Sequence, residues 1–330
     1  MSDFLSLSVA VGRYDRTQAL LDGRVQIEAA DAKFESPPFE TLFERAYDHE
    51  AYDVAELSFS NYIYLTSIGR CPYVGLPIFP SKMFRHSAIF IRTDRNIQKP
   101  VDLAGRLVGV REYSMTAAMT ARGILADEYG VPSSKIRWRY GPAEANDSKP
   151  VIRMLPKGFN IAPLGDDDNL SDALANGTLD ALVVYKPPSC FKRHVPNIAR
   201  LFPEHEKQEA DYFARTGIFP LMHLIGVRRS LIRERPDICL AVCDAFEAAK
   251  KIALDELSSY QAVTISHPWA PVEAARIKKL FGDDSWTYGV EANRASLDAL
   301  IRWSFTQGVT KRQLRIEELF APFAFDWKKH

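Results

Sequence analysis

Arginine, tyrosine and hydroxyl-bearing side chains follow several of the strands that the sequence predicts, at the point where each strand ends. The groups are Arg13-Tyr14-Asp15, Ser58-Phe59-Ser60, Arg111-Glu112-Tyr113-Ser114 and Tyr185-Lys186. Guanidinium groups bind carboxylates through paired hydrogen bonds, and tyrosine rings can line a slot for an aromatic molecule. A helix that begins after Ser114 would add free backbone N–H groups, which favour an anion. The sequence therefore predicts a binding site for a small aromatic anion.

Two parts of the chain repeat one order of elements, and this order would position those side chains. In each part a strand, a loop and a helix are followed by a helix, a strand and a loop. The expected strands are Leu5–Val11, Val54–Leu57, Leu107–Val110 and Ala181–Tyr185. The best-marked helix is Met115–Tyr129, which Ser114 would cap and Gly130 would end. Ligands of open α/β sheets lie beyond the carboxyl ends of the strands, so the groups above would meet in one cleft.

The repeated order predicts an α/β protein with two lobes and a ligand cleft between them. His86–Arg92 would be an apolar strand that carries the chain toward the second lobe, and Phe219–Val227 would return it. Lobe one would then comprise residues 1–92 and 218–330, and lobe two residues 95–215. A single continuous sheet, or two sequential domains divided near residue 150, would contradict this prediction.

The composition excludes some classes of partner. The chain has 330 residues, and its 42 Lys and Arg residues balance its 42 Asp and Glu residues. A neutral chain has no general attraction to nucleic acid or to an anionic membrane, so any anion site must be local. The sequence lacks a run of about 18 apolar residues, which argues against a membrane span. Because the start Met1-Ser2-Asp3-Phe4 shows no basic signal segment, we expect a cytoplasmic protein.

Several strings of the sequence match one family pattern. They are Tyr14-Asp15 with Leu20-Leu21-Asp22-Gly23, Arg85-His86-Ser87, Tyr113-Ser114-Met115-Thr116-Ala117, Ala121-Arg122-Gly123-Ile124-Leu125, Glu128-Tyr129-Gly130-Val131 and, most specific, Phe202-Pro203, Glu209, Tyr212-Phe213, Thr216-Gly217-Ile218-Phe219-Pro220 and Met222-His223. Together they resemble the 4,5-dihydroxyphthalate decarboxylase family from about residue 9 to about residue 250. Two residues of the predicted site depart from the pattern: Arg111 stands where we expect proline, and Arg13 is atypical beside Gly12.

The resemblance implies a type II periplasmic-binding-protein-like fold and a carboxy-lyase. The implied reaction converts 4,5-dihydroxyphthalate, or a close analogue, to protocatechuate during the breakdown of aromatic compounds. Each carboxylate of this substrate is para to a hydroxyl, so loss of the phenolic proton pushes electron density onto the carbon that carries the carboxylate. Protonation of that carbon lets CO₂ leave with the ring as electron sink, and this route requires no cofactor. The protein must supply a base, an acid and a cation for the spectator carboxylate.

Histidine suits such proton transfer, and two histidines lie in the family-like strings at the starts of the expected crossing strands. The catalytic candidates are His223, His86, Asp15 and Glu112. The substrate-binding candidates are Arg13, Tyr14, Ser58, Ser60, Arg85, Arg111, Tyr113, Ser114, Thr116, Tyr185 and Lys186. Of these, either Arg85 or Arg111 would clamp a substrate carboxylate. The histidines could instead be structural.

Other interpretations remain open. A histidine pair with Asp15 or Glu112 could bind a divalent metal, although no compact metal motif is present and we assign no metal ligand. A non-catalytic solute receptor for a small aromatic anion would share the fold but would require export. An enzyme of the thiamine-pyrimidine-synthase kind would need a lysine for pyridoxal phosphate, for which Lys186 is the best-placed residue, and a cysteine cluster that the sequence lacks. The expected partner is a small aromatic carboxylate, and a homo-oligomer stays open.

Overall fold

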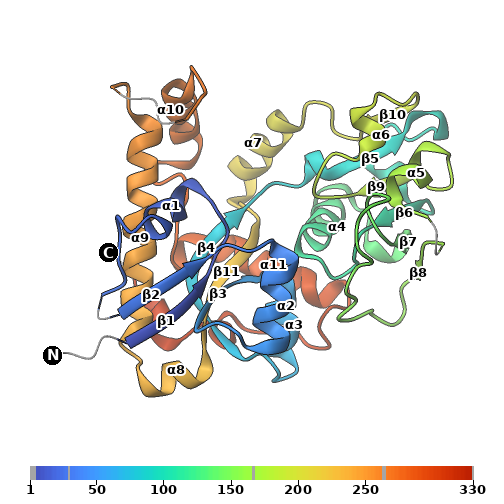
Figure 1. Cartoon of the computed structure of the whole chain (residues 1–330). Coiled ribbons are helices and arrows are strands. Elements are labelled where there is room, and N and C mark those ends of the chain that lie inside the picture. The colour runs from blue at the N-terminus through green and yellow to red at the C-terminus, as the bar shows by residue number, and fades with distance from the viewer. Residues whose placement is uncertain (1–4, 29, 166–167, 262–264, 329–330) are drawn as a thin grey trace.

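The computed structural model describes residues 5–28, 30–165, 168–261 and 265–328, which form two β-sheets with helices packed around them (Figure 1). We call the part built on the five-stranded sheet lobe one and the part built on the six-stranded sheet lobe two. In Figure 1 lobe one lies on the left and lobe two on the right, with strand β4 (Tyr73–Lys82) and the short strand β5 (Ile89–Arg92) leading from one to the other. The two-lobed α/β architecture predicted from the sequence is therefore confirmed.

The sheet of lobe one has the order β2-β1-β3-β11-β4. Its strands are β1 (Leu5–Ala10), β2 (Ala30–Glu35), β3 (Val54–Ser58), β4 (Tyr73–Lys82) and β11 (Leu221–Arg228). Strand β1 pairs in parallel with β2 and β3, whereas β11 runs antiparallel between β3 and β4. The helices of this part are α1 (Asp15–Leu21), α2 (Phe39–His49) and α3 (Phe59–Ser67). Strand β11 thus returns the chain to a sheet begun more than a hundred residues earlier.

The sheet of lobe two has the order β10-β5-β9-β6-β7-β8. Its strands are β5 (Ile89–Arg92), β6 (Leu107–Val110), β7 (Arg137–Tyr140), β8 (Ile161–Pro163), β9 (Ala181–Val183) and β10 (Ile198–Arg200). The helices are α4 (Thr116–Tyr129), α5 (Leu170–Ala175), α6 (Ser189–Lys192) and α7 (His205–Thr216). Strand β5 pairs with β9 and β10, so the crossing into this sheet precedes residue 89.

The chain after β11 is helical and belongs with lobe one. It forms α8 (Arg229–Glu234), α9 (Ile238–Ser258), α10 (Ala270–Phe281) and α11 (Arg294–Thr306). Helices α9 and α10 stand along the outer side of this lobe (Figure 1), and α11 also contacts α4. Among the described residues no helix is long and apolar enough to cross a membrane.

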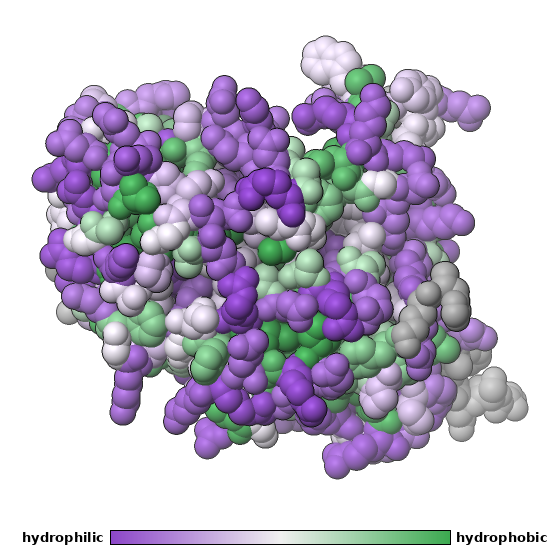
Figure 2. Space-filling view, turned by 180° about the vertical axis from the view of Figure 1, so that it is seen from behind, coloured by the Kyte–Doolittle hydropathy of each residue, from purple (hydrophilic) through white to green (hydrophobic). Residues whose placement is uncertain are grey.

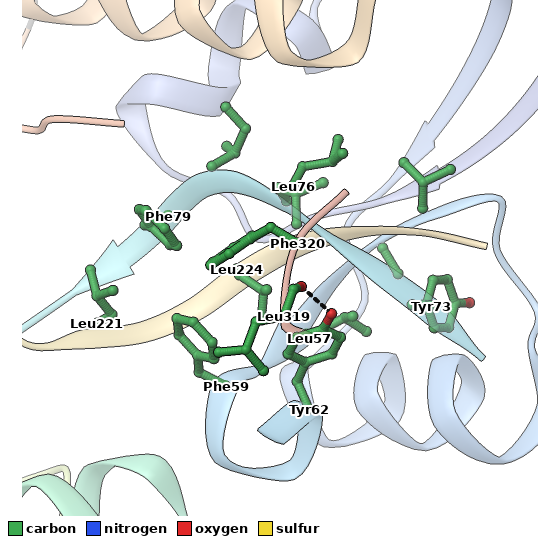
Figure 3. Close-up of a cluster of buried hydrophobic side chains, with 14 of the residues drawn as sticks. Leu57, Phe59, Tyr62, Tyr73, Leu76, Phe79, Leu221, Leu224, Leu319 and Phe320 are labelled. Atoms are coloured by element: carbon green, nitrogen blue, oxygen red, sulfur yellow. Dashed lines mark hydrogen bonds between the residues drawn. The ribbon is translucent and has the colours of Figure 1, made fainter. Parts of the chain in front are cut away.

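The core of lobe one lies around the central strands, where β-branched, leucine and aromatic side chains meet. Figure 3 shows its centre, with Leu57, Phe59, Leu224 and other buried side chains from β3, β4, β11 and α3 around the segment that carries Leu319. The Tyr62 hydroxyl donates a hydrogen bond to the Leu319 carbonyl oxygen, which satisfies both groups in the apolar interior. This core fixes β3 against β11, and both strands carry residues of the candidate site.

Helix α4 is formed as its apolar spacing predicts, except at its start. Ala117, Ala118, Ala121, Ile124 and Leu125 are all buried, and Gly130 ends the helix in the left-handed region with φ 66°. The predicted cap is wrong: no side chain caps the helix, whose first residue is Thr116. The N-cap position belongs to Met115, so Ser114 lies one residue too early to cap the helix, and its hydroxyl donates to the Glu112 carboxylate.

Candidate active site

The Glu56 carboxylate is the centre of a buried hydrogen-bond network in lobe one. Glu56 lies in the otherwise apolar strand β3 and is 0% exposed. Its Oε2 accepts the Gly12 backbone N–H at 2.8 Å, and its Oε1 accepts the Tyr14 hydroxyl at 2.7 Å. The same Oε1 lies 2.6 Å from Nδ1 of His223. Strand β11 brings His223 there because His223 pairs with Ser58, two residues beyond Glu56 on the same face.

The free side of the His223 ring faces aromatic side chains. The rings of Phe39 and Phe43, on helix α2, both lie 5.0 Å from the imidazole between centroids, and Phe39 is 6.2 Å from Tyr14. Phe39 is 37% exposed although it is a large apolar residue. The His223 side chain is 17% exposed, and its Nε2 makes no hydrogen bond within the described part of the chain. One imidazole nitrogen is thus available beside an accessible aromatic ring.

Tyr14 remains a hydrogen-bond donor in this network. Burial, together with the neighbouring negative charge of Glu56, raises the pKa of the Tyr14 hydroxyl far above its usual value. The Arg16 guanidinium lies between the Tyr14 and Trp286 rings, 4.2 Å and 4.0 Å from their centroids, and its Nε donates to the Pro80 carbonyl oxygen. The phenol therefore holds its proton at neutral pH and fixes the carboxylate that it contacts.

Three hydroxyl groups connect the two lobes beside this network. The Thr116 hydroxyl, at the start of α4, lies 3.2 Å from Ser58 Oγ and 2.9 Å from Ser60 Oγ. It also accepts the Ser60 backbone N–H at 3.0 Å. All three side chains are buried. Three of the predicted binding residues, Ser58, Ser60 and Thr116, thus lie together, and in this conformation they satisfy one another.

Arg111 also bridges the lobes, through carboxylates. Its Nη2 lies 2.6 Å from the Glu40 carboxylate of α2, and its Nη1 lies 3.4 Å from Asp147 in lobe two. A second pair joins the same helix to lobe two, because Arg153 binds the Asp48 carboxylate through two contacts of 2.6 Å. The α2 helix that carries Phe39 is thus tied at both ends to the opposite lobe. Arg111 could bind a ligand carboxylate only if that carboxylate replaced Glu40 or Asp147 as its partner.

Arg85 is a buried cation without such a partner. It lies between β4 and β5, is 7% exposed, and donates from Nε to the sulfur of Met222 at 3.3 Å. It forms no ion pair within the described residues. Burial lowers the pKa of its guanidinium to about 10, against a smaller opposing effect of Glu209. The guanidinium stays charged at neutral pH and lacks the counter-ion that such burial calls for.

His86 is not brought to this network. It is 1% exposed and packs against the rings of Phe202 and Tyr212, with centroids 5.2 Å and 5.4 Å away. Its Nδ1 has no hydrogen-bond partner in the described chain, and the nearest carboxylate oxygen, from Glu209, is 3.9 Å away. Burial lowers the pKa of this imidazole to about 4, so it is neutral at pH 7. These features are those of a structural histidine.

Because His86 is buried and neutral, we expect the stability of the fold to decrease at acidic pH. Its pKa is about 4 in the folded chain and 6.5 for an unperturbed imidazole. Between these pH values the imidazole is therefore protonated in the unfolded chain but neutral in the folded chain. Stability is therefore lost as the pH falls from about 6.5 toward 4, by on the order of 3 kcal/mol. His86→Phe should flatten the dependence of the melting temperature on pH over this range. His267→Gln, at an exposed position, should leave it unchanged, and an unaltered slope in His86→Phe would contradict the assignment.

Other predicted residues lie apart from the Glu56 network. Tyr113 is buried in the core of lobe two, where its hydroxyl lies 2.7 Å from Ser133 Oγ. Arg13 is exposed, and Asp15 is half exposed and paired with Arg16. Lys186 lies over the Tyr185 ring, 5.3 Å from its centroid.

Glu112 is a buried carboxyl on the lobe-two side. Burial raises its pKa, and the charges of Arg153, Arg111 and Arg122 act in the opposite direction. Ser114 donates to it, as described above. Glu112 therefore binds a proton more readily than an ordinary carboxyl does, which suits an acid, but it makes no contact with His223.

Sequence reasoning missed Glu56, Phe39 and Phe43. The only local signal for Glu56 is a carboxylate in the middle of the buried strand Val54–Ser58, where an ionisable group is costly without partners. No group of three or more His, Cys, Asp or Glu side chains able to hold a metal ion occurs among the described residues.

The sequence is similar to curated enzymes. It is 37% identical to a 4,5-dihydroxyphthalate decarboxylase of Comamonas testosteroni over 323 residues, which cover 98% of both chains. It is 38% identical to a 4,5-dihydroxyphthalate decarboxylase of Pseudomonas putida over 210 residues, which cover 63% of this chain and 81% of that protein. No protein-family model matches the chain.

The fold is similar to that of solved binding proteins. The periplasmic aliphatic sulphonate binding protein SsuA from Escherichia coli matches with a TM-score of 0.55 at 13% identity, covering 98% of this chain and 99% of that one. The alkanesulfonate-binding protein SsuA from Xanthomonas axonopodis pv. citri gives 0.54 at 12% identity, with 96% and 97% covered. The desulfurization enzyme DSZB gives 0.51 at 14% identity, with 98% of both chains covered. These matches confirm the type II periplasmic-binding-protein fold.

Proposed function

Since the chain belongs to the 4,5-dihydroxyphthalate decarboxylase family, we propose that it removes CO₂ from 4,5-dihydroxyphthalate, or a close analogue, to give protocatechuate or the matching product. The observation that carries this proposal is the Glu56–His223 pair, whose unpartnered Nε2 stands beside the exposed ring of Phe39. An aromatic substrate can stack on such a ring while an imidazole exchanges protons with it.

The chemistry requires one proton to replace one carboxylate. The phenol para to the leaving carboxylate gives up its proton, and His223 delivers a proton from Nε2 to the ring carbon that bears this carboxylate. The C–C bond then breaks, its electron pair returns to the ring, CO₂ leaves, and the phenolate is protonated again. The proposed route consumes one proton overall and uses no cofactor, and we propose that it takes place in the cytoplasm. Exclusion of water between the lobes favours the charge-shifted intermediate.

A cation is needed for the carboxylate that stays on the ring. Arg85→Ala or Arg111→Ala should weaken substrate binding by about 2–5 kcal/mol, because loss of the true clamp leaves a buried carboxylate unpaired. Arg85 is the better candidate because it has no ion-pair partner in the described chain, whereas Arg111 already binds Glu40. Titration of each variant with substrate by calorimetry checks this. If both variants bind as the parent protein does, the clamp lies elsewhere.

The function itself is tested by incubating the purified protein with 4,5-dihydroxyphthalate and with its 3,4-dihydroxy isomer. We expect the 4,5 isomer to disappear with equal amounts of CO₂ and protocatechuate formed. A compound that binds tightly but is recovered unchanged would indicate a solute-binding receptor for aromatic anions instead. If the protein neither binds nor turns over any dihydroxyphthalate, both functions are refuted.

A further inference from the structure

Glu56 is the most deeply buried carboxylate of the candidate site, and the residues next to it in β3 offer its side chain no polar partner. Its neighbours Ala55 and Leu57 are 0% exposed, as Glu56 itself is. Transfer of a carboxylate into such surroundings is costly unless it is hydrogen-bonded and its charge is balanced. The three groups that contact it come from separate segments: Gly12 and Tyr14 follow β1, and His223 lies on β11. The fold therefore gathers donors around this one side chain.

His223 is the only basic side chain that pairs with Glu56 in the described part of the chain. Arg16 is the nearest candidate for a second cation, because its guanidinium lies over the Tyr14 ring. Its Nε donates to the Pro80 carbonyl oxygen and its Nη1 to the Asp15 carboxylate, and among the described residues its only ion pair is with Asp15. The remaining partners of Glu56, the Tyr14 hydroxyl and the Gly12 N–H, are neutral. His223 is therefore the basic side chain that contacts Glu56 directly in the described part of the chain.

The geometry also fixes which nitrogen of His223 can act. Both oxygens of Glu56 are held, Oε2 by Gly12 and Oε1 by Tyr14, so the carboxylate cannot rotate freely. Oε1 meets Nδ1 of His223, and Phe39 and Phe43 flank the ring. An imidazole whose Nδ1 donates to a carboxylate presents Nε2 to its other side. A carboxylate in this relation to histidine sets the tautomer and stabilises the imidazolium without itself taking the proton.

We propose that Glu56 is a positioning residue, which holds the proton on Nδ1 of His223 so that Nε2 is the nitrogen that gives a proton to the ring carbon. Tyr14 is the second positioning residue, because its hydroxyl fixes the Glu56 carboxylate. Neither residue touches the reacting atoms. The inference rests on the proposed decarboxylation for its catalytic part, whereas the tautomer of His223 is a property of the protein alone.

Four variants test the proposal. Glu56→Gln keeps the shape but removes the charge, Glu56→Asp keeps the charge, and Tyr14→Phe removes only the hydroxyl. Glu35→Gln, an exposed carboxylate paired with Arg45 at the sheet edge, is the matched control. The protein is labelled with ¹⁵N-histidine, and the His223 resonances are assigned with His223→Asn. The kinetic constants with 4,5-dihydroxyphthalate and the melting temperature are measured on the same samples.

The expected spectrum of the parent protein contains an imidazole N–H resonance from Nδ1 of His223, shifted downfield by the carboxylate. In Glu56→Gln this resonance should be lost or moved, kcat should fall by about 10²-fold or more, and KM should change little. In Glu56→Asp the Nδ1 resonance and kcat should both be partly restored. In Tyr14→Phe both should take values between those of the parent protein and Glu56→Gln, and in Glu35→Gln both should match the parent protein. A variant that lost stability alone would lower the melting temperature without changing the His223 tautomer.

Two outcomes separate failure of this inference from failure of the proposed function. If the parent protein turns over 4,5-dihydroxyphthalate but Glu56→Gln keeps its kcat within about threefold, the inference is overturned and the function stands. If the parent protein turns over no dihydroxyphthalate, the function fails, and the spectra still decide whether Glu56 sets the tautomer. An unchanged His223 spectrum in Glu56→Gln overturns the inference in either case.

Discussion

Replacement of His223 by asparagine is expected to lower kcat by about 10²-fold or more while ligand binding is largely kept. Asparagine preserves the polar character of the side chain but cannot carry a proton to carbon at neutral pH. The acid in this step must hold its proton near pH 7, which an imidazolium does better than an unperturbed carboxyl. Turnover, ligand affinity and melting temperature should be measured side by side.

His86→Asn provides the comparison for His223→Asn. His86 is buried among Phe202 and Tyr212 and is not brought to Glu56, so its replacement should lower the melting temperature and turnover together. If both variants keep near-normal turnover, the proton comes from Asp15, Glu112, a tyrosine or a metal-bound water. A selective loss of kcat in His86→Asn, with His223→Asn unaffected, would reverse the assignment.

Replacement of Trp303 by alanine is expected to destabilise the protein by about 3–5 kcal/mol, the usual cost of truncating a buried aromatic side chain. Trp303, on α11, packs directly on Gly123 of α4, where a Cβ would lie 2.2 Å from the indole ring. Its Nε1 donates to Asp127 at 2.8 Å. The truncation would therefore leave a cavity between α4 and α11 and remove one of the donors to Asp127, whose carboxylate keeps its contacts with Arg302. Chemical denaturation monitored by circular dichroism measures the change in the free energy of unfolding.

Phe305→Ala, on the same helix, is the control for Trp303→Ala. Phe305 is 42% exposed, so its loss should change the free energy of unfolding much less than the loss of Trp303, by about 1 kcal/mol or less. A cost below about 1 kcal/mol for Trp303→Ala would mean that the contact between α4 and α11 adds little to stability.

The sequence predicts the fold because its strongest signals are local. Apolar spacing marks α4, and Gly130 marks its end, since a left-handed terminus suits glycine. The order of strands and helices then favours two lobes, each of which is built on a mixed sheet in the structure. The start of α4 differs from the prediction because the helix begins at Thr116 with Met115 at the N-cap position, and the hydrogen bond from Ser114 to Glu112 depends on the folded loop.

The site was predicted in part, for the residues that follow strands. Ser58, Ser60 and Thr116 lie within hydrogen-bonding distance of one another, where β3 leads into α3 and where α4 begins. Glu56 was missed because its partner His223 is 167 residues away, and only the pairing of β3 with β11 brings them together. Spacing along a chain carries no information about such a contact.

The molecular surface shows why the amino-acid composition does not predict the position of an anion site. Figure 2 shows the molecule from behind, where hydrophilic side chains cover most of the face and apolar residues gather toward its middle. A neutral chain with such a surface shows no overall preference for an anion, so the proposed recognition of a carboxylate depends on individual groups such as the buried Arg85.

Decarboxylation of 4,5-dihydroxyphthalate in D₂O is the measurement that tests the central claim most directly. If the protein places a solvent-derived proton on the carbon that loses CO₂, the protocatechuate formed must carry one carbon-bound deuterium at that position. We expect mass spectrometry and NMR to find this single deuterium in step with CO₂ release by the parent protein, and product formation to be at least about 10²-fold slower with His223→Asn. Recovery of unchanged 4,5-dihydroxyphthalate, with no CO₂ and no deuterated product, would contradict the claim.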